Sequence, residues 1–114
     1  MKKLVLVPAL ALMSLSVTPV AQASNVAQSL CEYVSVDDKK RLRSFLKSNK
    51  LKIRAIFDGV QCNGKNLLAF ASDNNSVKTG AMMINKLPKK TVKTHLATIT
   101  SSELAEAANK RVAG

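Results

Sequence analysis

Few side chains in this 114-residue sequence have a type and a spacing that could carry chemistry. The cysteines are Cys31 and Cys62, and the single histidine, His95, lies in a stretch rich in threonine and lysine. Proton transfer requires a positioned partner, and no cysteine or carboxylate stands at a nearby spacing from the histidine. The neighbouring carboxylates Asp37 and Asp38 would diverge by about 100° on a helix, which favours helix capping over paired acid–base catalysis. We therefore expect a protein without catalytic residues, without a metal ion and without a cofactor.

The first 23 residues have the three-part order of a cleavable secretory signal. Residues 1–3 include two lysines, residues 4–17 are apolar apart from two serines, and Ala21 and Ala23 provide small side chains before a cleavage site. The apolar run is shorter than the roughly 20 residues that a membrane-spanning helix needs, which argues against the alternative of an N-terminal anchor. We predict cleavage after Ala23, no transmembrane segment in the mature chain, and a periplasmic or secreted location.

Export would place the two cysteines in an oxidising environment, where thiols are usually paired. The alternatives are a reactive thiol pair, which usually has two intervening residues, and a metal site, which needs four ligands. Neither alternative suits the observed spacing, so we predict a structural disulfide between Cys31 and Cys62. Closing this loop of about 32 residues would stabilise the folded state by about 3.5–4 kcal/mol.

The spacing of apolar residues predicts an all-α fold of four to six short helices. Helices are expected over residues 25–34, 36–48, 50–57, 67–72 and 77–87, with a last helix carrying Leu104, Ala108 and Val112. For residues 50–57 a strand is the alternative, and residues 89–100 could be extended, helical or loose. A short polar link between residues 72 and 77 predicts an antiparallel helical hairpin at the centre of the chain.

Capping residues and glycines sharpen these expectations. The expected N-caps are Ser35 paired with Asp38, Ser76, and Thr100 paired with Glu103. Gly59 is expected to end its helix through a left-handed backbone, and residues 62–64 have the composition of a turn. Gly80 and Ala81 would let their helix lie close to the preceding one. The last helix is rich in alanine, so we expect it to pack loosely.

These features predict three segments in the chain. Residues 1–23 form the signal peptide, residues 24–88 form a disulfide-tied helical domain, and residues 89–114 form a basic C-terminal extension with one helix.

Charge is the strongest physical signal in the sequence. Without residues 1–23, which contain two lysines, 16 Lys and Arg remain against 7 Asp and Glu, a net charge of +9. Eight of these cations and no acid fall within the 16 residues 39–54. On a helix, most of them would form one positive strip beside an apolar stripe. The anion-binding residues predicted from this strip are Lys39, Lys40, Arg43, Lys47 and Lys50.

The strip has two interpretations. It could bind an anionic envelope component or an acidic protein, in which case binding would weaken as salt is added. Alternatively, it is a solvated face that keeps a small protein in solution. We do not expect a nucleic-acid partner, because the chain carries an export signal and its aromatic residues fall at core positions and not between the cations.

Several spaced motifs between residues 25 and 88 carry a family resemblance. They are Cys31-Glu32-Tyr33-Val34, Asp38, Arg41-Leu42-Arg43, Leu51-Lys52-Ile53-Arg54, Cys62-Asn63-Gly64 and Leu67-Leu68-Ala69-Phe70-Ala71. The chain resembles a family of small exported bacterial proteins known only as a domain of unknown function, with a paired Cys-Glu and Cys-Asn-Gly signature. The resemblance implies that the two signature cysteines pair and that the protein is exported. It implies no activity, cofactor or catalytic residue.

The sequence thus predicts a non-enzymatic periplasmic binding or accessory module that presents a basic helical face. The alternative is a protein–protein interaction module that docks through an apolar helical surface, with its charge incidental. The oligomeric state is not predicted by the sequence.

Overall fold

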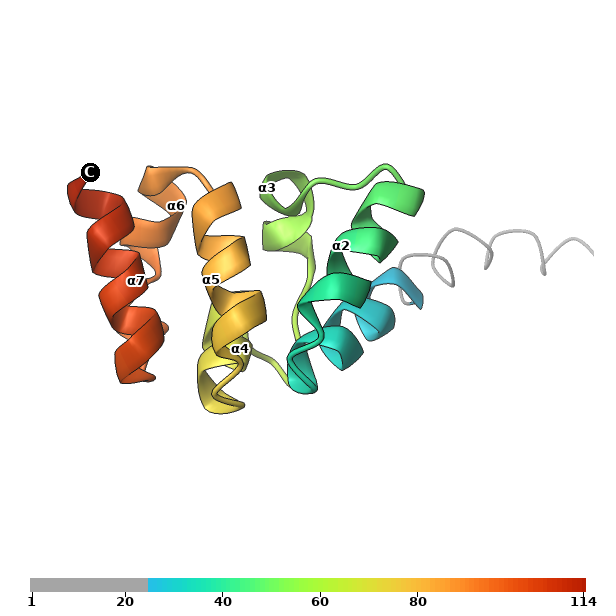
Figure 1. Cartoon of the computed structure of the whole chain (residues 1–114), viewed down its shortest axis with the longest axis horizontal. Helices are drawn as coiled ribbons and strands as arrows, with labels where there is room; N and C mark the ends of the chain where they lie inside the picture. The colour runs from blue at the N-terminus through green and yellow to red at the C-terminus, as the bar shows by residue number, and fades with distance from the viewer. Residues whose placement is uncertain (1–24) are drawn as a thin grey trace, which may run out of the picture.

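A computed structural model describes residues 25–114, so the predicted signal peptide lies outside the described residues. Within this range the fold is all-α, as predicted. After a helix over residues 25–35, the elements are α2 (Lys39–Ser48), α3 (Ile53–Ile56), the 3₁₀ turn η1 (Phe57–Gly59), α4 (Leu67–Asp73), α5 (Val77–Lys86), α6 (Lys89–Thr94), the 3₁₀ turn η2 (Leu96–Thr98) and α7 (Ser102–Ala113). Figure 1 shows the first helix and α2 towards one end, α4 and α5 in the middle, and α6 and α7 at the other end.

One apolar core runs through all of these helices. Fully buried side chains come from the first helix, from each longer helix and from the link after α5: Leu30, Leu42, Leu67, Leu68, Met83, Ile84, Leu87 and Leu104. Each such side chain stabilises the fold by roughly 1.5–3 kcal/mol relative to exposure. None of the helices between residues 25 and 114 is long and apolar enough to cross a membrane.

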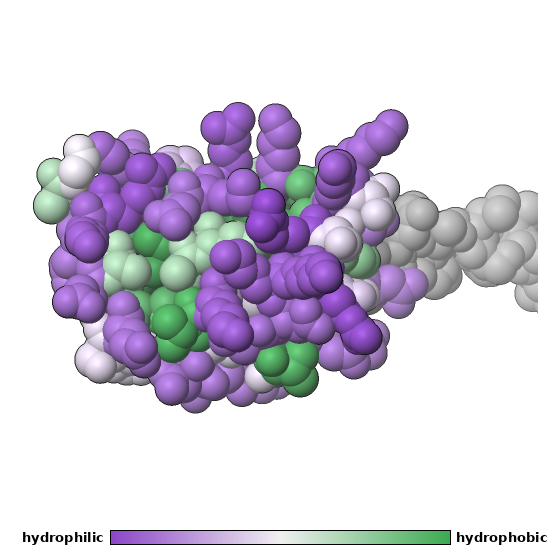
Figure 2. Space-filling view, viewed as in Figure 1, coloured by the Kyte–Doolittle hydropathy of each residue, from purple (hydrophilic) through white to green (hydrophobic). Residues whose placement is uncertain are grey.

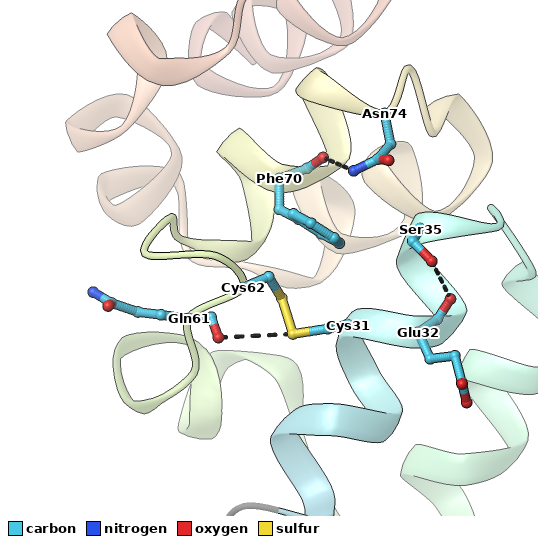
Figure 3. Close-up of a disulfide and its surroundings, with 7 residues drawn as sticks. All are labelled: Cys31, Glu32, Ser35, Gln61, Cys62, Phe70 and Asn74. Carbon is cyan, nitrogen blue, oxygen red and sulfur yellow. Dashed lines mark hydrogen bonds between the residues drawn. A yellow bond between two sulfur atoms is a disulfide. The ribbon is translucent and has the colours of Figure 1, made fainter.

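The predicted disulfide between Cys31 and Cys62 joins the first helix to the turn that follows η1. The two Cα atoms are 5.7 Å apart, a usual separation for bridged cysteines. Figure 3 shows the bridge, with the Cys31 sulfur 3.7 Å from the carbonyl oxygen of Gln61. The bridge therefore ties the N-terminal helix to the middle of the chain.

The Cys62-Asn63-Gly64 segment forms the predicted turn. The φ angles of Asn63 and Gly64 are 54° and 78°, and the N–H of Cys62 donates to the carbonyl of Lys65 at 2.8 Å. Two successive left-handed residues make a type I′ turn, for which Asn-Gly is a preferred pair. Gly59 has no left-handed backbone, so the reason given for the end of its helix was wrong.

α2 begins three residues later than predicted. Its N-cap is Asp38, whose carboxylate accepts the N–H of Arg41 at 3.0 Å. Ser35 does not cap α2, because the first helix continues through Ser35 and its hydroxyl donates to the carbonyl of Glu32 at 2.8 Å. The predicted capping box was therefore wrong, although Asp38 does act as a cap.

α4 and α5 form the predicted helical hairpin, joined by residues 74–76. Asn66 caps α4 by accepting the N–H of Ala69 at 2.8 Å. Ser76 occupies the predicted N-cap position of α5, but its hydroxyl donates to the carbonyl of Val34 at 2.5 Å. Ser76 thus joins the start of α5 to the first helix, and the cap of α5 comes from elsewhere.

α7 packs closely, contrary to the expectation of loose packing. Leu104 and Ala108 have 1% and 0% of their surface exposed. A Cβ atom built on Gly80 would lie only 2.6 Å from Cδ2 of Leu104. Gly80 therefore permits a close helix approach, as predicted, and the side chain that approaches it comes from α7. α5 also packs against α4, as predicted.

The start of α7 also differs from the prediction. Its N-cap is Ser101, which makes no side-chain capping bond, and the Thr100 hydroxyl lies 3.1 Å from that of Ser72 instead. The sequence did not predict a single conformation for residues 89–100, and in the structure they fold into α6 and η2. Among the described residues this gives seven α-helices, one more than the expected range.

Candidate anion-binding groove

α2 separates apolar and basic side chains onto different faces. Leu42 and Leu46 are buried, with 0% and 7% exposure, whereas every Lys and Arg of the helix is exposed. Figure 2 shows that hydrophilic side chains cover most of the face over α2 and α3, and several project from the surface. The amphipathic spacing of α2 therefore fixes where its cations point.

An open groove of about 1230 Å³ lies between α2, α3 and α5. Ser44 of α2 and Asn85 of α5 contribute polar groups to its lining, and Leu46 and Ile53 lie at its floor. The basic side chains that line it are Lys39, Lys40, Arg43 and Lys47 from α2, Lys52 and Arg54 from the α3 region, and Lys78 and Lys86 from α5.

The structure places four of the five predicted anion-binding residues on this groove, and Lys50 is the exception. Asn49 ends α2, and Lys50 follows it with a φ of 53°. Because Lys50 is outside the helix, the advance of about 100° per residue no longer describes its direction. The predicted strip is therefore one wall of the groove, without Lys50.

The opposite wall was not predicted from the sequence. Lys78 and Lys86 stand eight residues apart in α5, which puts them about 80° apart around the helix axis. The spacing in the sequence indicated that these two lysines lie on the same side of one helix. Nothing local indicated that this side faces α2, because that contact depends on how the helices pack.

No cation of the groove has a carboxylate partner within residues 25–114. The ion pairs of this range join Arg41 to Asp38, at 3.4 Å, and Lys65 to Asp73. Asp37 and Asp38 also line the groove, but their carboxylates cap the N-termini of α5 and α2. The facing walls therefore carry like charges that repel each other, and an anion between them would relieve the repulsion.

Asp37 holds the two walls in position. Its φ is 54°, and its carboxylate accepts the backbone N–H groups of Lys78, at 3.2 Å, and Thr79, at 2.8 Å. It also accepts the hydroxyl of Thr79 at 3.0 Å. A residue just before α2 thus caps the N-terminus of α5, where a negative charge is favoured. This contact fixes the spacing between the α2 and α5 walls.

A smaller cleft of about 480 Å³ surrounds His95 on another part of the molecule. The His95 ring packs edge-on against Phe57, with centroids 5.2 Å apart, and its Nδ1 lies 3.4 Å from the amide nitrogen of Asn66. Asp58 and Asp73 also line this cleft, so His95 has carboxylates nearer than its sequence neighbours suggested. In the described part of the chain, no three His, Cys, Asp or Glu side chains are grouped to hold a metal ion.

The comparisons with known proteins bear on the segment that forms the groove. No curated protein and no solved structure matched the chain. One family model, described as "Protein of unknown function (DUF3718)", matches residues 30–94. The matched segment includes both cysteines, α2, α3 and α5. Because this segment is more than half of the sequence, the chain belongs to this family of proteins of unknown function.

Proposed function

We propose that the protein is a non-enzymatic binding or accessory module of the periplasm. Its groove between α2, α3 and α5 would receive an anionic envelope component or an acidic protein. The observation that carries this proposal is the set of eight basic side chains around one groove, none paired with a carboxylate in the described part of the chain.

The location rests on three features of the chain. The N-terminal residues have the pattern of an export signal, the two cysteines are bridged, and no helix of residues 25–114 is suited to spanning a membrane. A disulfide of this kind is typical of proteins that fold outside the cytosol. Together these features support a protein that is exported and released.

The alternative, docking through an apolar helical surface, has less support. Among the described residues, Val36 is the one large hydrophobic side chain classed as exposed, at 67%. An apolar docking face would need a contiguous exposed patch of several such residues. The proposal therefore assigns binding to charge and not to apolar contact.

Charge reversal on the α2 wall tests the proposal. The mature chain would carry Arg43→Glu and Lys47→Glu, and its retention on immobilised lipopolysaccharide and on immobilised polyglutamate would be measured across a salt gradient. We expect the variant to elute at clearly lower salt than the parent from at least one of the two matrices, because screened charge–charge attraction holds the complex.

The matched control is Lys90→Glu with Lys93→Glu on α6. Both lysines are exposed and lie outside the groove, and the net charge changes by the same amount. The control should elute close to the parent. If parent, groove variant and control elute together at every ionic strength, the basic groove has no binding role. Circular dichroism would confirm that each variant is folded.

A further inference from the structure

The groove carries cations on both of its walls. Arg43 and Lys47 lie on the α2 wall, and Arg54 and Lys86 lie on the α3–α5 wall. An anion that touched α2 alone would leave the second wall without a counter-charge. A ligand seated in the groove meets both walls, so it must carry several negative charges within a small volume.

Charge density separates the possible ligands. Eight basic and two acidic side chains line a space of about 1230 Å³, so its lining has a net charge of +6. A phosphomonoester carries about −1.5 to −2 charges at pH 7, so about three or four phosphates would balance this charge. A carboxylate carries a single charge, so an acidic peptide would need about six side chains in the same space. The groove therefore favours phosphate groups over carboxylates.

The floor of the groove offers little to a protein partner. Protein interfaces are usually anchored by large side chains that enter apolar pockets. Of the apolar side chains that line the groove, Leu46 and Ile53 are only 7% and 2% exposed, and Val36 is the one that is largely exposed, at 67%. Six of the eight groove cations are lysines, which bind phosphate as point charges without a fixed geometry. These features again favour a compact phosphorylated ligand.

Building on the proposed function, we propose that the groove binds a compact polyol or saccharide bearing several phosphomonoester groups, held between the α2 wall and the α3–α5 wall. Ser44 and Asn85 would donate hydrogen bonds to its hydroxyl or phosphate oxygens from opposite walls. The same chemistry occurs in soluble sugar phosphates and in phosphorylated lipid headgroups. The open side of the groove admits either source.

Isothermal titration of the mature protein with myo-inositol hexakisphosphate, and separately with a decaglutamate peptide, tests this proposal. Three double variants would be compared: Arg43→Glu/Lys47→Glu on the α2 wall, Arg54→Glu/Lys86→Glu on the other wall, and the control Lys90→Glu/Lys93→Glu on α6. None of these residues contacts Asp37 in the structure, so the cap between the walls is preserved.

We expect the parent to bind the phosphate probe about tenfold or more tightly than the peptide at an ionic strength of about 0.15 M. Each wall variant should lose about tenfold in affinity, and the control about twofold or less.

If the α3–α5 variant binds like the parent while the α2 variant is weakened, the α2 strip binds the anion alone. The proposed function then stands and this inference fails. Equal or tighter binding of the peptide also overturns the inference. If no variant differs from the parent, or neither probe binds, this inference fails, and the retention experiment on lipopolysaccharide and polyglutamate decides the proposed function separately.

Vesicles distinguish the two sources of phosphate. The parent would be sedimented with phosphatidylcholine vesicles that contain or lack phosphatidic acid, whose headgroup is a phosphomonoester. Co-sedimentation that requires phosphatidic acid and is reversed by the hexakisphosphate supports a lipid headgroup in the groove. Tight binding of the soluble probe without co-sedimentation supports a soluble sugar phosphate. Co-sedimentation that both wall variants retain unchanged would place lipid binding outside the groove and count against the proposal.

Discussion

The region before the Cys62 turn and the region after it are built into the fold in different ways. The first helix and α2 are joined to the rest by a disulfide, by the carboxylate of Asp37 and by the hydrogen bond from Ser76 to Val34, in addition to the shared core. α5 and α7 meet mainly through close packing, where Gly80 admits Leu104, and Arg111 of α7 also donates to the carbonyl of Leu87 at 3.0 Å. Substitutions at the links of the first region should therefore act by removing a specific contact, and those at the Gly80–Leu104 contact by changing volume.

The largest effect is expected at the covalent link. Cys31→Ser with Cys62→Ser should lower the free energy of unfolding by about 3.5–4 kcal/mol, because the unfolded chain regains the freedom of a loop of about 32 residues. Urea unfolding of the mature chain, with and without dithiothreitol, measures this change. The free energy of unfolding of the double variant should be the same with and without dithiothreitol. An equal stability of parent and variant would show that the first region is held by its core contacts alone.

A volume change at the α5–α7 contact should come next. Gly80→Val places a branched side chain where even a Cβ would lie 2.6 Å from Leu104, and we expect a loss of about 2–3 kcal/mol. Combining it with Leu104→Ala should cost less than the sum of the two single changes, because the shortened side chain makes room. Thermal and urea unfolding of the four proteins in this cycle give the coupling. If the losses of the two single variants simply add in the double variant, the loss in Gly80→Val does not come from the contact with Leu104.

Asp37 and Asp38 allow a direct comparison between a link to a distant helix and a local helix cap. Asp37 caps a helix that begins 40 residues later, whereas Asp38 caps its own helix. Asp37→Ala should cost about 2 kcal/mol, because it removes three hydrogen bonds and leaves a residue without a polar side chain at positive φ. Asp38→Ala should cost about 1 kcal/mol. Unfolding experiments on both variants should give this order, and the reverse order would refute the link between the walls.

The smallest effect on stability is expected at the groove. Arg43→Glu with Lys47→Glu should change the free energy of unfolding by no more than about 0.5 kcal/mol, since both side chains are exposed and unpaired in the described residues. A larger loss would assign these cations a role in the fold itself. Their effect should instead be seen in the binding measurements described above.

Local patterns accounted for most of the helices. The spacing of Leu42 and Leu46, the Asn-Gly pair after Cys62 and the polar link between α4 and α5 each depend on near neighbours, and each was predicted correctly. The cysteine pairing was also predictable, because only two cysteines were available in a chain with an export pattern.

Some of the errors come from contacts between distant residues. Ser76 matched a capping template, but its hydroxyl bonds Val34, 42 residues earlier. The error at Ser35 is local, because the first helix continues through Ser35 and its hydroxyl bonds Glu32 of the same helix. The α2 wall of the groove was predicted from helical periodicity. The α3–α5 wall was not, because a sequence pattern shows which residues share a side of a helix but not what that side faces.

The close fit of α7 against α5 determines where a recombinant fragment can end. The family match stops at residue 94, before Leu104 and Ala108, which are almost completely buried. A fragment truncated there would leave the Gly80 side of α5 open to water and would expose apolar surface to other molecules. Expression plasmids for structural work should therefore encode the chain through at least residue 113, even though the last 19 of those residues lie beyond the family match.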